Sequence, residues 1–363
     1  MIYNYVILGA GLAGLSLADA LQEHTERILV LDTRGIGAGA SGTPVGMINP
    51  ATGRRGKKVW HVEKALPSIH QSLQSAASFA DQPLYVRKGI LRPARDQEMA
   101  DEMHKRYRKS EWPPGWCYWL TEKEIQQFHP GIHCVSGGLW LPVGMAVRVP
   151  NYLQALARKF ADQNGEIRIR PSYTYHSYRD SYWQISTDRD EKIKTRKLVF
   201  ASGAGVLKET IWEWVPLNAV KGQVAQFKFE HPLPFGHSIS SKGYLAHTDQ
   251  HHLTVGSTYE HNYEDGQPNE KGLARLTDIM HSILPELSES GTLERQWAGF
   301  RVSSDDHKPV LGPHPTLKNI FLFTGLGSKG LLHGKYLGEL LAKHLVKGGT
   351  LPEKVNISRF NRP

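Results

Sequence analysis

The residues with the clearest chemical meaning are the glycines of a Gly-Ala-Gly-Leu-Ala-Gly sequence close to the N-terminus. Gly9 permits a tight turn, Gly11 lets the backbone approach a pyrophosphate, and Gly14 lets a helix pack closely on a strand. Asp32 follows the apolar run 28–31, where a carboxylate can accept hydrogen bonds from a ribose. This spacing predicts a binding site for a dinucleotide cofactor.

The segments around these glycines have the patterns that the motif requires. An apolar strand is predicted over 5–8, and a helix follows the loop, with leucines at positions 12, 15, 17 and 21. The N-terminus of that helix offers free N–H groups and the positive end of a dipole to phosphates. Because strand, glycines, helix, second strand and acidic residue agree, we favour dinucleotide binding over an ordinary glycine-rich turn.

A second glycine-rich stretch covers residues 35–47. Its small residues permit close backbone approach to a ligand, and the Ser41 hydroxyl can donate to a phosphate. The alternative interpretation is a flexible surface loop. Its nearness to Asp32 favours a second cofactor contact.

The periodicity along the chain predicts the fold. Helical and strand patterns alternate at both ends, which is typical of a parallel, doubly wound sheet. Short alternating strands between about 217 and 257 predict an antiparallel sheet, and a helix is predicted around 96–109. We therefore expect an α/β protein, a Rossmann-type domain with an inserted antiparallel-sheet substrate domain. The expected ranges are 1–65, 146–215 and 296–363 for the nucleotide-binding domain, and 66–145 and 216–295 for the substrate domain.

Composition narrows the class of protein. The chain has 363 residues, a formal net charge of +9 and two cysteines, Cys117 and Cys134. No apolar run approaches the roughly 20 residues that span a bilayer. Met1 leads almost directly into a strand pattern instead of a basic leader, so we expect a cytoplasmic protein. Because there are only two cysteines, we expect no disulfide framework. The positive charge favours an anionic partner without identifying it.

Several motifs together make the chain resemble the D-amino-acid oxidase-like (DAO) family of FAD-dependent oxidoreductases. This family includes glycine oxidase, sarcosine oxidase and the FAD domain of a bifunctional tRNA-modifying enzyme, the 5-methylaminomethyl-2-thiouridine biosynthesis protein. The wording at 325–331 is most similar to the tRNA-modifying enzyme, whereas Thr43-Pro44 departs from the family's asparagine-containing stretch. The motifs lie at 9–14 with Asp32, at 38–46, at 198–204, at 220–223, at 297–301 with Asp305 or Asp306 and 309–312, and at 323–331.

The resemblance implies a glutathione-reductase-like FAD-binding domain. It also implies non-covalent FAD, because 302–304 lacks the cysteine to which some family members attach the flavin. The expected FAD contacts are Gly9, Gly11, Leu12, Ala13, Gly14, Asp32, Thr33, Arg34, Ser41, Gly42, Gly46, Met47, Ala201, Ser202, Gly203, Gly327, Ser328, Lys329, Gly330 and Leu331.

Two residues are expected to contact the substrate by the same resemblance. Arg301 is similar to the family arginine that binds a substrate carboxylate, and a guanidinium suits bidentate carboxylate recognition. The alternative for Arg301 is a structural ion pair with Asp305 or Asp306. Tyr244 resembles a family active-site tyrosine, and its alternative is an ordinary aromatic residue of the sheet.

The C-terminal motif is predicted to be strand, glycine turn and helix, with the helix ending near Gly348-Gly349. In the family the start of this helix faces the flavin, where its positive end would stabilise reduced, anionic flavin. Lys329 either assists this stabilisation or is a solvated loop lysine.

Histidines and basic clusters remain outside these motifs. His247, His251 and His252 are expected at the surface of a hairpin tip, and no metal site is predicted. Two basic clusters, 54–58 and 104–109, lie among aromatic residues and would suit an RNA backbone with a stacked base. Solvated protein faces are the alternative for both clusters.

Three functions follow in order of preference. The first is oxidation of the C–N bond of an amine or amino acid, with hydride transfer to flavin and hydrolysis of the imine. The second is the same chemistry on a carboxymethylaminomethyl group of a tRNA wobble uridine. The third is a flavin-bound RNA-binding protein without turnover.

Overall fold

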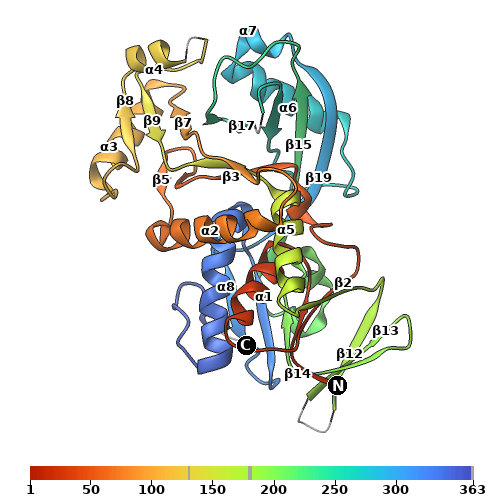
Figure 1. Ribbon diagram of the computed structural model, residues 1–363. Helices are drawn as coiled ribbons and strands as arrows, with labels where there is room; N and C mark the ends of the chain where they lie inside the picture. Colours follow the sequence, from red (N-terminus) through yellow and green to blue (C-terminus); the bar gives the residue numbers. More distant parts are fainter. Residues whose placement is uncertain (130, 179–181, 248, 361–363) are drawn as a thin grey trace.

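The computed structural model describes residues 1–129, 131–178, 182–247 and 249–360. Its elements gather in two halves, one above and one below the level of helix α2 (Val62–Ala76) and strand β3 (Val45–Ile48) in Figure 1. Both ends of the chain lie in the lower half (Figure 1).

The first sheet, in the lower half, has the topology that the glycine motif predicts. Strand β1 (Ile2–Leu8) lies between β2 (Ile28–Asp32) and β14 (Lys192–Phe200), and both pairings are parallel. Strand β11 (Glu166–Ile169) extends it in parallel beyond β2, and β21 (Ile320–Thr324) beyond β14. The predicted parallel pairing of these strands is confirmed. Antiparallel additions are β12 (Tyr173–Tyr178), β13 (Tyr182–Thr187) and β20 (Val310–Pro313).

A helical layer packs beside this sheet because its apolar faces need cover. Helix α1 (Leu12–Gln22) packs against α5 (Val149–Asp162) and α8 (Gly330–Lys347), and α2 also contacts α8. Small residues let α1 and α8 approach closely: a Cβ at Gly338 would lie 2.9 Å from the Ser16 carbonyl oxygen. Helix α8 ends at Lys347, with Gly348 in the left-handed conformation, as the sequence predicts.

The second large sheet, in the upper half, is antiparallel apart from one parallel pair, β16 with β7. Its order is β19-β15-β18-β17-β16-β7-β9-β8, which confirms the antiparallel sheet predicted between 217 and 257. The strands are β7 (Ile90–Pro93), β8 (Tyr118–Leu120), β9 (Gly138–Leu141), β15 (Leu217–Lys228), β16 (Ser238–Ser240), β17 (Tyr244–Ala246), β18 (His252–Gly256) and β19 (Thr292–Ser304).

Helices and short elements complete the upper half. Helix α3 (Gln97–Lys109) begins where Asp96 accepts a hydrogen bond from the Met99 N–H, close to the predicted bounds. Helix α6 (Glu270–Ile283) covers β15 and β18. The remaining elements are α4 (Glu122–Phe128), α7 (Pro285–Ser288), β4 (Ala51–Thr52), β5 (Lys57–Lys58), β6 (Tyr85–Val86), β10 (Met145–Arg148) and the short 3₁₀ helices η1 (Ala40–Gly42), η2 (Ala77–Phe79), η3 (Gly203–Lys208), η4 (Thr210–Trp212), η5 (Gly327–Lys329) and η6 (Ile357–Arg359).

The domain boundaries expected from the sequence stay a prediction. Strand β19 runs across the expected boundary at residue 296 and pairs with β15 along its length. In the described part of the chain, no helix has both the length and the apolar character needed to cross a membrane.

Candidate functional site

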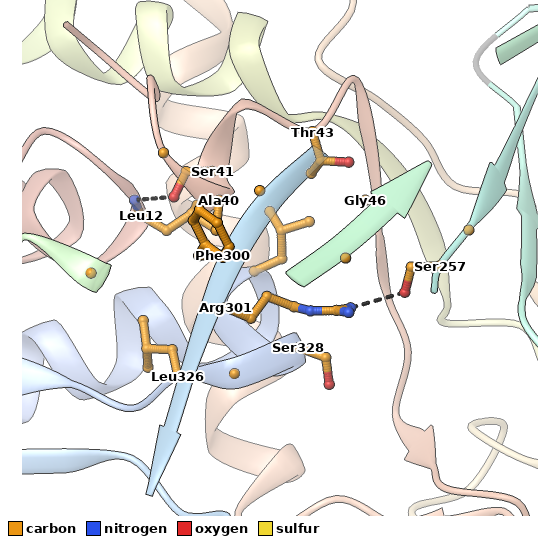
Figure 2. Close-up of a pocket in the computed structure, with 18 of the residues that line it drawn as sticks. Leu12, Ala40, Ser41, Thr43, Gly46, Ser257, Phe300, Arg301, Leu326 and Ser328 are labelled. Carbon is orange, nitrogen blue, oxygen red and sulfur yellow. Dashed lines mark hydrogen bonds between the residues drawn. The ribbon is translucent and has the colours of Figure 1, made fainter. Parts of the chain in front are cut away.

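A cavity of about 690 Å³ lies where the two large sheets approach each other. One end is lined by the loops that follow β1, β2, β14 and β21, and the other by strands of the antiparallel sheet. Figure 2 shows side chains from both groups facing this space. The glycine motif and the expected substrate residues therefore share one cavity.

The first glycine loop is held in shape by its own backbone. Gly9 has a φ of +116°, in the region that favours glycine, and its N–H donates to the Leu31 carbonyl at 2.8 Å. A Cβ at Gly9 would lie 2.5 Å from the Ala201 carbonyl oxygen, and one at Gly14 only 1.8 Å from the Gly9 carbonyl oxygen. These glycines are thus required by close packing of the loop, as the motif predicts.

Asp32 organises the neighbouring turn. One of its carboxylate oxygens accepts from the Ala10 N–H at 2.8 Å, and the other from the N–H groups of Arg34 and Gly35 at 2.8 and 2.9 Å. Ionised carboxylate oxygens have lone pairs to spare, so the same group can still accept from ribose hydroxyls. Asp32 and Arg34 line the cavity, and Thr33 lies outside its lining.

Ser41 connects the second glycine-rich stretch to the first. Its hydroxyl oxygen accepts from the Leu12 N–H at 3.1 Å, at the N-terminus of α1 (Figure 2). The hydroxyl hydrogen remains available to donate into the cavity. The stretch is therefore an ordered part of the cavity wall, where Ser41, Gly46 and Met47 are lining residues.

The other expected cofactor loops reach the same cavity. Ala201, Ser202 and Gly203, after β14, line it, and Ser202 is half-buried with its hydroxyl unpartnered. At the C-terminal motif the lining residues are Gly327, Ser328, Gly330 and Leu331, so the N-terminus of α8 opens on the cavity.

Lys329 has a different environment from its neighbours. It lies outside the cavity lining and is half-buried, so neither of the two interpretations from the sequence describes it fully. Burial, and the nearby positive charge of Lys57, lower the pKa of its ammonium group. Gly14 and Gly42 also lie outside the lining, and both act through packing; a Cβ at Gly42 would be 2.7 Å from the Gly37 carbonyl oxygen.

These residues fit FAD, the cofactor expected from the sequence. Two helix N-termini, those of α1 and α8, face one cavity, and both suit negative charge. The loop at Gly9 leaves no room for side chains between itself and Ala201, so backbone groups, the natural partners of a pyrophosphate, form the wall.

Arg301 extends from β19 across the cavity wall (Figure 2). Its guanidinium donates to the Ser257 hydroxyl at 2.9 Å and to the Thr258 carbonyl at 2.5 Å, and stacks on the Tyr259 ring at 4.2 Å. On its other side it lies against Gly222, where a Cβ would meet it at 2.4 Å. These contacts fix the plane of the guanidinium and leave donors free for a carboxylate.

The structural alternative for Arg301 is excluded. Asp305 accepts a hydrogen bond from Asn218, and Asp306 forms an ion pair with Arg359 at 2.9 Å. Neither aspartate is the partner of Arg301, whose hydrogen bonds go to neutral groups.

Tyr244 lines the cavity from strand β17 and contacts strand β3. Its hydroxyl donates to the Val45 carbonyl at 3.2 Å, on strand β3. Burial raises the pKa of this phenol to about 12, so it is neutral at ordinary pH. A neutral hydroxyl can position a substrate, but it does not act as a base at neutral pH.

At the far end of the cavity, sequence reasoning identified Arg54, as part of the basic cluster 54–58, but missed Arg92, Arg95 and Lys242. Arg92 is the deepest of them, and an arginine inside the apolar run 90–94 was a signal that a special environment would be needed. Tyr259, which stacks on Arg301, was also missed. The lining residues at this end that the motifs did not identify include Arg54, Arg92, Arg95, Ser240, Ser241, Lys242, Ser257 and Tyr259.

The expectation for the histidines is wrong in one respect. They lie at a hairpin between β17 and β18, as predicted, but His247 is buried, with its ring packed against Phe235. The ring lies against an aromatic residue of the apolar core instead of in water. Among the described residues, no cluster of potential ligands suitable for a metal ion is found.

The basic clusters lie beside each other, and three residues of the first cluster form ion pairs with acidic side chains. Arg54 forms an ion pair with Asp96 at 3.2 Å, and Arg55 lies 3.8 Å from Glu98. Lys58 contacts Glu63 at 2.6 Å. Of both clusters, only Arg54 belongs to the described lining of the cavity.

Comparisons with known proteins agree with the site. The chain is 22% identical over 356 residues to a glycine oxidase from Geobacillus kaustophilus, covering 94% of this chain and 92% of that protein. It is 24% identical to the tRNA 5-methylaminomethyl-2-thiouridine biosynthesis bifunctional protein of Marinobacter nauticus, covering 94% of this chain but 55% of that longer protein.

Solved structures share the fold. The crystal structure of glycine oxidase from Geobacillus kaustophilus superposes with a TM-score of 0.85 at 22% identity, covering 99% of this chain and 98% of that one. Iminodiacetate oxidase from Chelativorans sp. BNC1 gives a TM-score of 0.82 at 19% identity, covering 99% and 97%. A family model described as FAD dependent oxidoreductase (DAO) matches residues 4–344, nearly the whole chain. The chain belongs to the DAO family of FAD-dependent oxidoreductases.

Proposed function

We propose that this enzyme oxidises the C–N bond of an amine or amino acid. The observation that carries the proposal is that Arg301, with its guanidinium plane fixed, lines the same cavity as the loops at Gly9 and Gly327. A substrate carboxylate held by Arg301 would place its amine-bearing carbon inside this cavity. Relatives named glycine oxidase and iminodiacetate oxidase support this substrate class.

The chain's residues have positioning roles in this proposal. Arg301 binds the carboxylate, and Tyr244 limits the position of the substrate from strand β17. The N-terminus of α8 supplies a positive dipole end to the cavity wall. Bound FAD would supply the hydride acceptor for the carbon next to the nitrogen, and water would hydrolyse the imine product. We assign no catalytic base, because an amine that binds in its neutral form needs none.

The FAD contacts expected from the sequence are part of the proposal. Most of them line the cavity, and Gly14 and Gly42 support it by packing. We infer non-covalent binding. We also infer a cytoplasmic location, supported by the free thiols of Cys117 and Cys134, both of which are buried.

A second candidate is oxidation of a carboxymethylaminomethyl group on tRNA. One observation favours it: Arg54, from the first basic cluster, lines the cavity. The relatives that are tRNA-modifying enzymes support it as well. The ion pairs of Arg54, Arg55 and Lys58 with acidic residues weaken it, since these charges are already compensated.

Anaerobic flavin reduction tests both candidates. The purified protein is mixed in turn with glycine, sarcosine, other D- and L-amino acids, and tRNA bearing carboxymethylaminomethyl-uridine, and flavin absorbance is followed. We expect bleaching by a free amino acid or N-substituted amino acid. Bleaching by tRNA alone would replace the first candidate with the second. Purified protein without flavin would overturn both.

A further inference from the structure

The most unusual charged residue in the structure is Arg92, on strand β7. It is 3% exposed, yet it lines the cavity. One terminal nitrogen donates to the Ser240 hydroxyl at 2.7 Å, and the other to the Gly53 carbonyl at 2.6 Å. Its Nε–H is buried without a partner. Because a guanidinium has five N–H donors, Arg92 keeps unused donors at the cavity wall.

The charge of Arg92 is not balanced by the protein. In the described chain, its electrostatic partners include the Cys117 thiol but no carboxylate. Burial lowers the pKa of the guanidinium to about 10, so it stays protonated at neutral pH. A buried charge without a counter-charge is costly, and proteins normally pair such groups. An anionic ligand would supply the missing counter-charge.

The neighbours of Arg92 strengthen the positive character of this end of the cavity. Arg95, Lys242 and Arg54 also line it, and the Nε–H of half-buried Arg95 is buried without a partner. Among the described lining residues, Asp32 is the single carboxylate, and it lies at the opposite end with its oxygens engaged by backbone N–H groups. Of these four basic residues, Arg54 alone has an acidic partner within the described part of the chain, Asp96.

The strand order separates this cluster from Arg301. The Arg301 guanidinium lies over Gly222 on β15 and reaches Ser257, just after β18. Strands β17 and β16 lie between β18 and β7. The Arg92 guanidinium itself reaches Ser240 on β16, so two inter-strand spacings, roughly 10 Å, separate the residues that the two guanidiniums contact. Glycine is too short to contact both arginines.

We propose that Arg92, with Arg95 and Lys242, forms a second anion subsite, so that the substrate is a small amino acid with a carboxylate or phosphate remote from the oxidised C–N bond. The inference rests on the proposed function and specifies its substrate class. Arg301 holds the carboxylate next to the reacting carbon, and the Arg92 subsite holds the distal anion. A free small molecule suits the site better than RNA, because Arg92 is buried and Arg54, Arg55 and Lys58 of the first basic cluster lie against acidic side chains.

The test compares two matched series of compounds on the holoenzyme. N-(ω-carboxyalkyl)glycines of increasing length carry a distal anion, and N-alkylglycines of equal length lack it. Anaerobic flavin reduction gives a second-order rate constant for each. We expect the charged series to be favoured by about 10- to 100-fold at the optimal length, the value of charge-assisted hydrogen bonds. Phosphonoalkyl analogues distinguish phosphate from carboxylate preference, and either preference supports the subsite.

Variants assign the effect to this subsite. Arg92→Met should reduce the ratio between the two series by about 10-fold or more. Lys242→Met should reduce this ratio by a smaller factor. Because Lys242 is exposed, this variant tests the subsite even if Arg92→Met fails to fold. Exposed Arg87, outside the cavity lining, provides the matched control, and Arg87→Met should leave the ratio unchanged.

The outcomes separate the two proposals. If neither series reduces the flavin, the proposed amine oxidation fails. If both series react equally well, amine oxidation stands and the second anion subsite is overturned. If Arg92→Met impairs reaction with modified tRNA and leaves the ratio between small substrates unchanged, the small-substrate assignment of this subsite is overturned.

Discussion

The two ends of the cavity are lined by different kinds of chemical groups. At the end expected to hold FAD, the wall is mainly backbone and small side chains, such as Gly9, Gly11 and Ala201. At the other end the wall carries Arg92 and Arg301, whose charges come from strands far apart in the sequence. The cofactor site depends on the conformation of the backbone, which must stay the same in every protein that binds the cofactor. The substrate site depends on side chains, which can be exchanged without altering that conformation.

The largest expected loss of function comes from a change at the end of the cavity that is expected to hold FAD. In Gly14→Ala, the added Cβ would overlap the Gly9 carbonyl oxygen at 1.8 Å, so the loop must shift. We expect loss of bound FAD and destabilisation by about 3 kcal/mol. Flavin content and thermal unfolding measure this. Gly348→Asn, at an open left-handed position away from the cavity, is the control and should retain FAD. Full flavin content in Gly14→Ala would contradict the assignment.

The next effect concerns the charged end. Arg301→Met should lower kcat/KM for amino-acid substrates by about 10²- to 10⁴-fold, because charge-assisted hydrogen bonds to the carboxylate are lost. FAD content should stay unchanged, in contrast to Gly14→Ala. The control is Arg295→Met, at an exposed position on the same strand. If kcat/KM falls equally for amines with and without a carboxylate, Arg301 supports the folded structure and does not bind the carboxylate.

Two buried histidines beside the antiparallel sheet predict that acid destabilises the protein. Burial lowers the pKa of His237 to about 3 and of His129 to about 4, and the two rings pack 3.6 Å apart beside the antiparallel sheet. Below pH 6.5 these two histidines take up protons in the unfolded chain but stay neutral in the folded protein. The free energy of unfolding should therefore fall as pH decreases from 6.5 to 4, by up to about 1.4 kcal/mol per unit for each histidine.

The measurement is urea unfolding at pH 7 and pH 4.5. His237→Phe should flatten the dependence, whereas His24→Gln, at an exposed position, should leave it unchanged. A dependence of the same steepness in His237→Phe would assign the acid sensitivity to other groups.

The smallest expected effect concerns the contact between Tyr244 and strand β3. Tyr244→Phe removes the hydrogen bond to the Val45 carbonyl. A neutral hydrogen bond contributes about 0.5–1.5 kcal/mol, so kcat/KM should fall by only about 3- to 10-fold. Tyr263→Phe, at an exposed tyrosine, serves for comparison. A loss as large as that of Arg301→Met would give Tyr244 a direct part in the chemistry.

The same contrast explains what the sequence could predict. The residues Gly9, Gly14 and Asp32 lie close together in the chain, and each type has one physical reason to be there, so the first sheet and its loops were predictable. The cavity position of Arg92 depends on Gly53 and Ser240, far away in the sequence. Likewise, the burial of His247 depends on a contact with Phe235, which no local pattern indicates.

Strand β19 has a consequence for redesign of the enzyme. It carries Arg301 and, through Gly299, lies against Ala40, where a Cβ on Gly299 would be 3.1 Å from the Ala40 Cα. The proposed carboxylate anchor thus lies on a strand that also contacts a loop of the proposed cofactor site, so a shift of β19 would change both. Directed evolution of substrate range should therefore start at β16 and β7, which β15, β18 and β17 separate from β19.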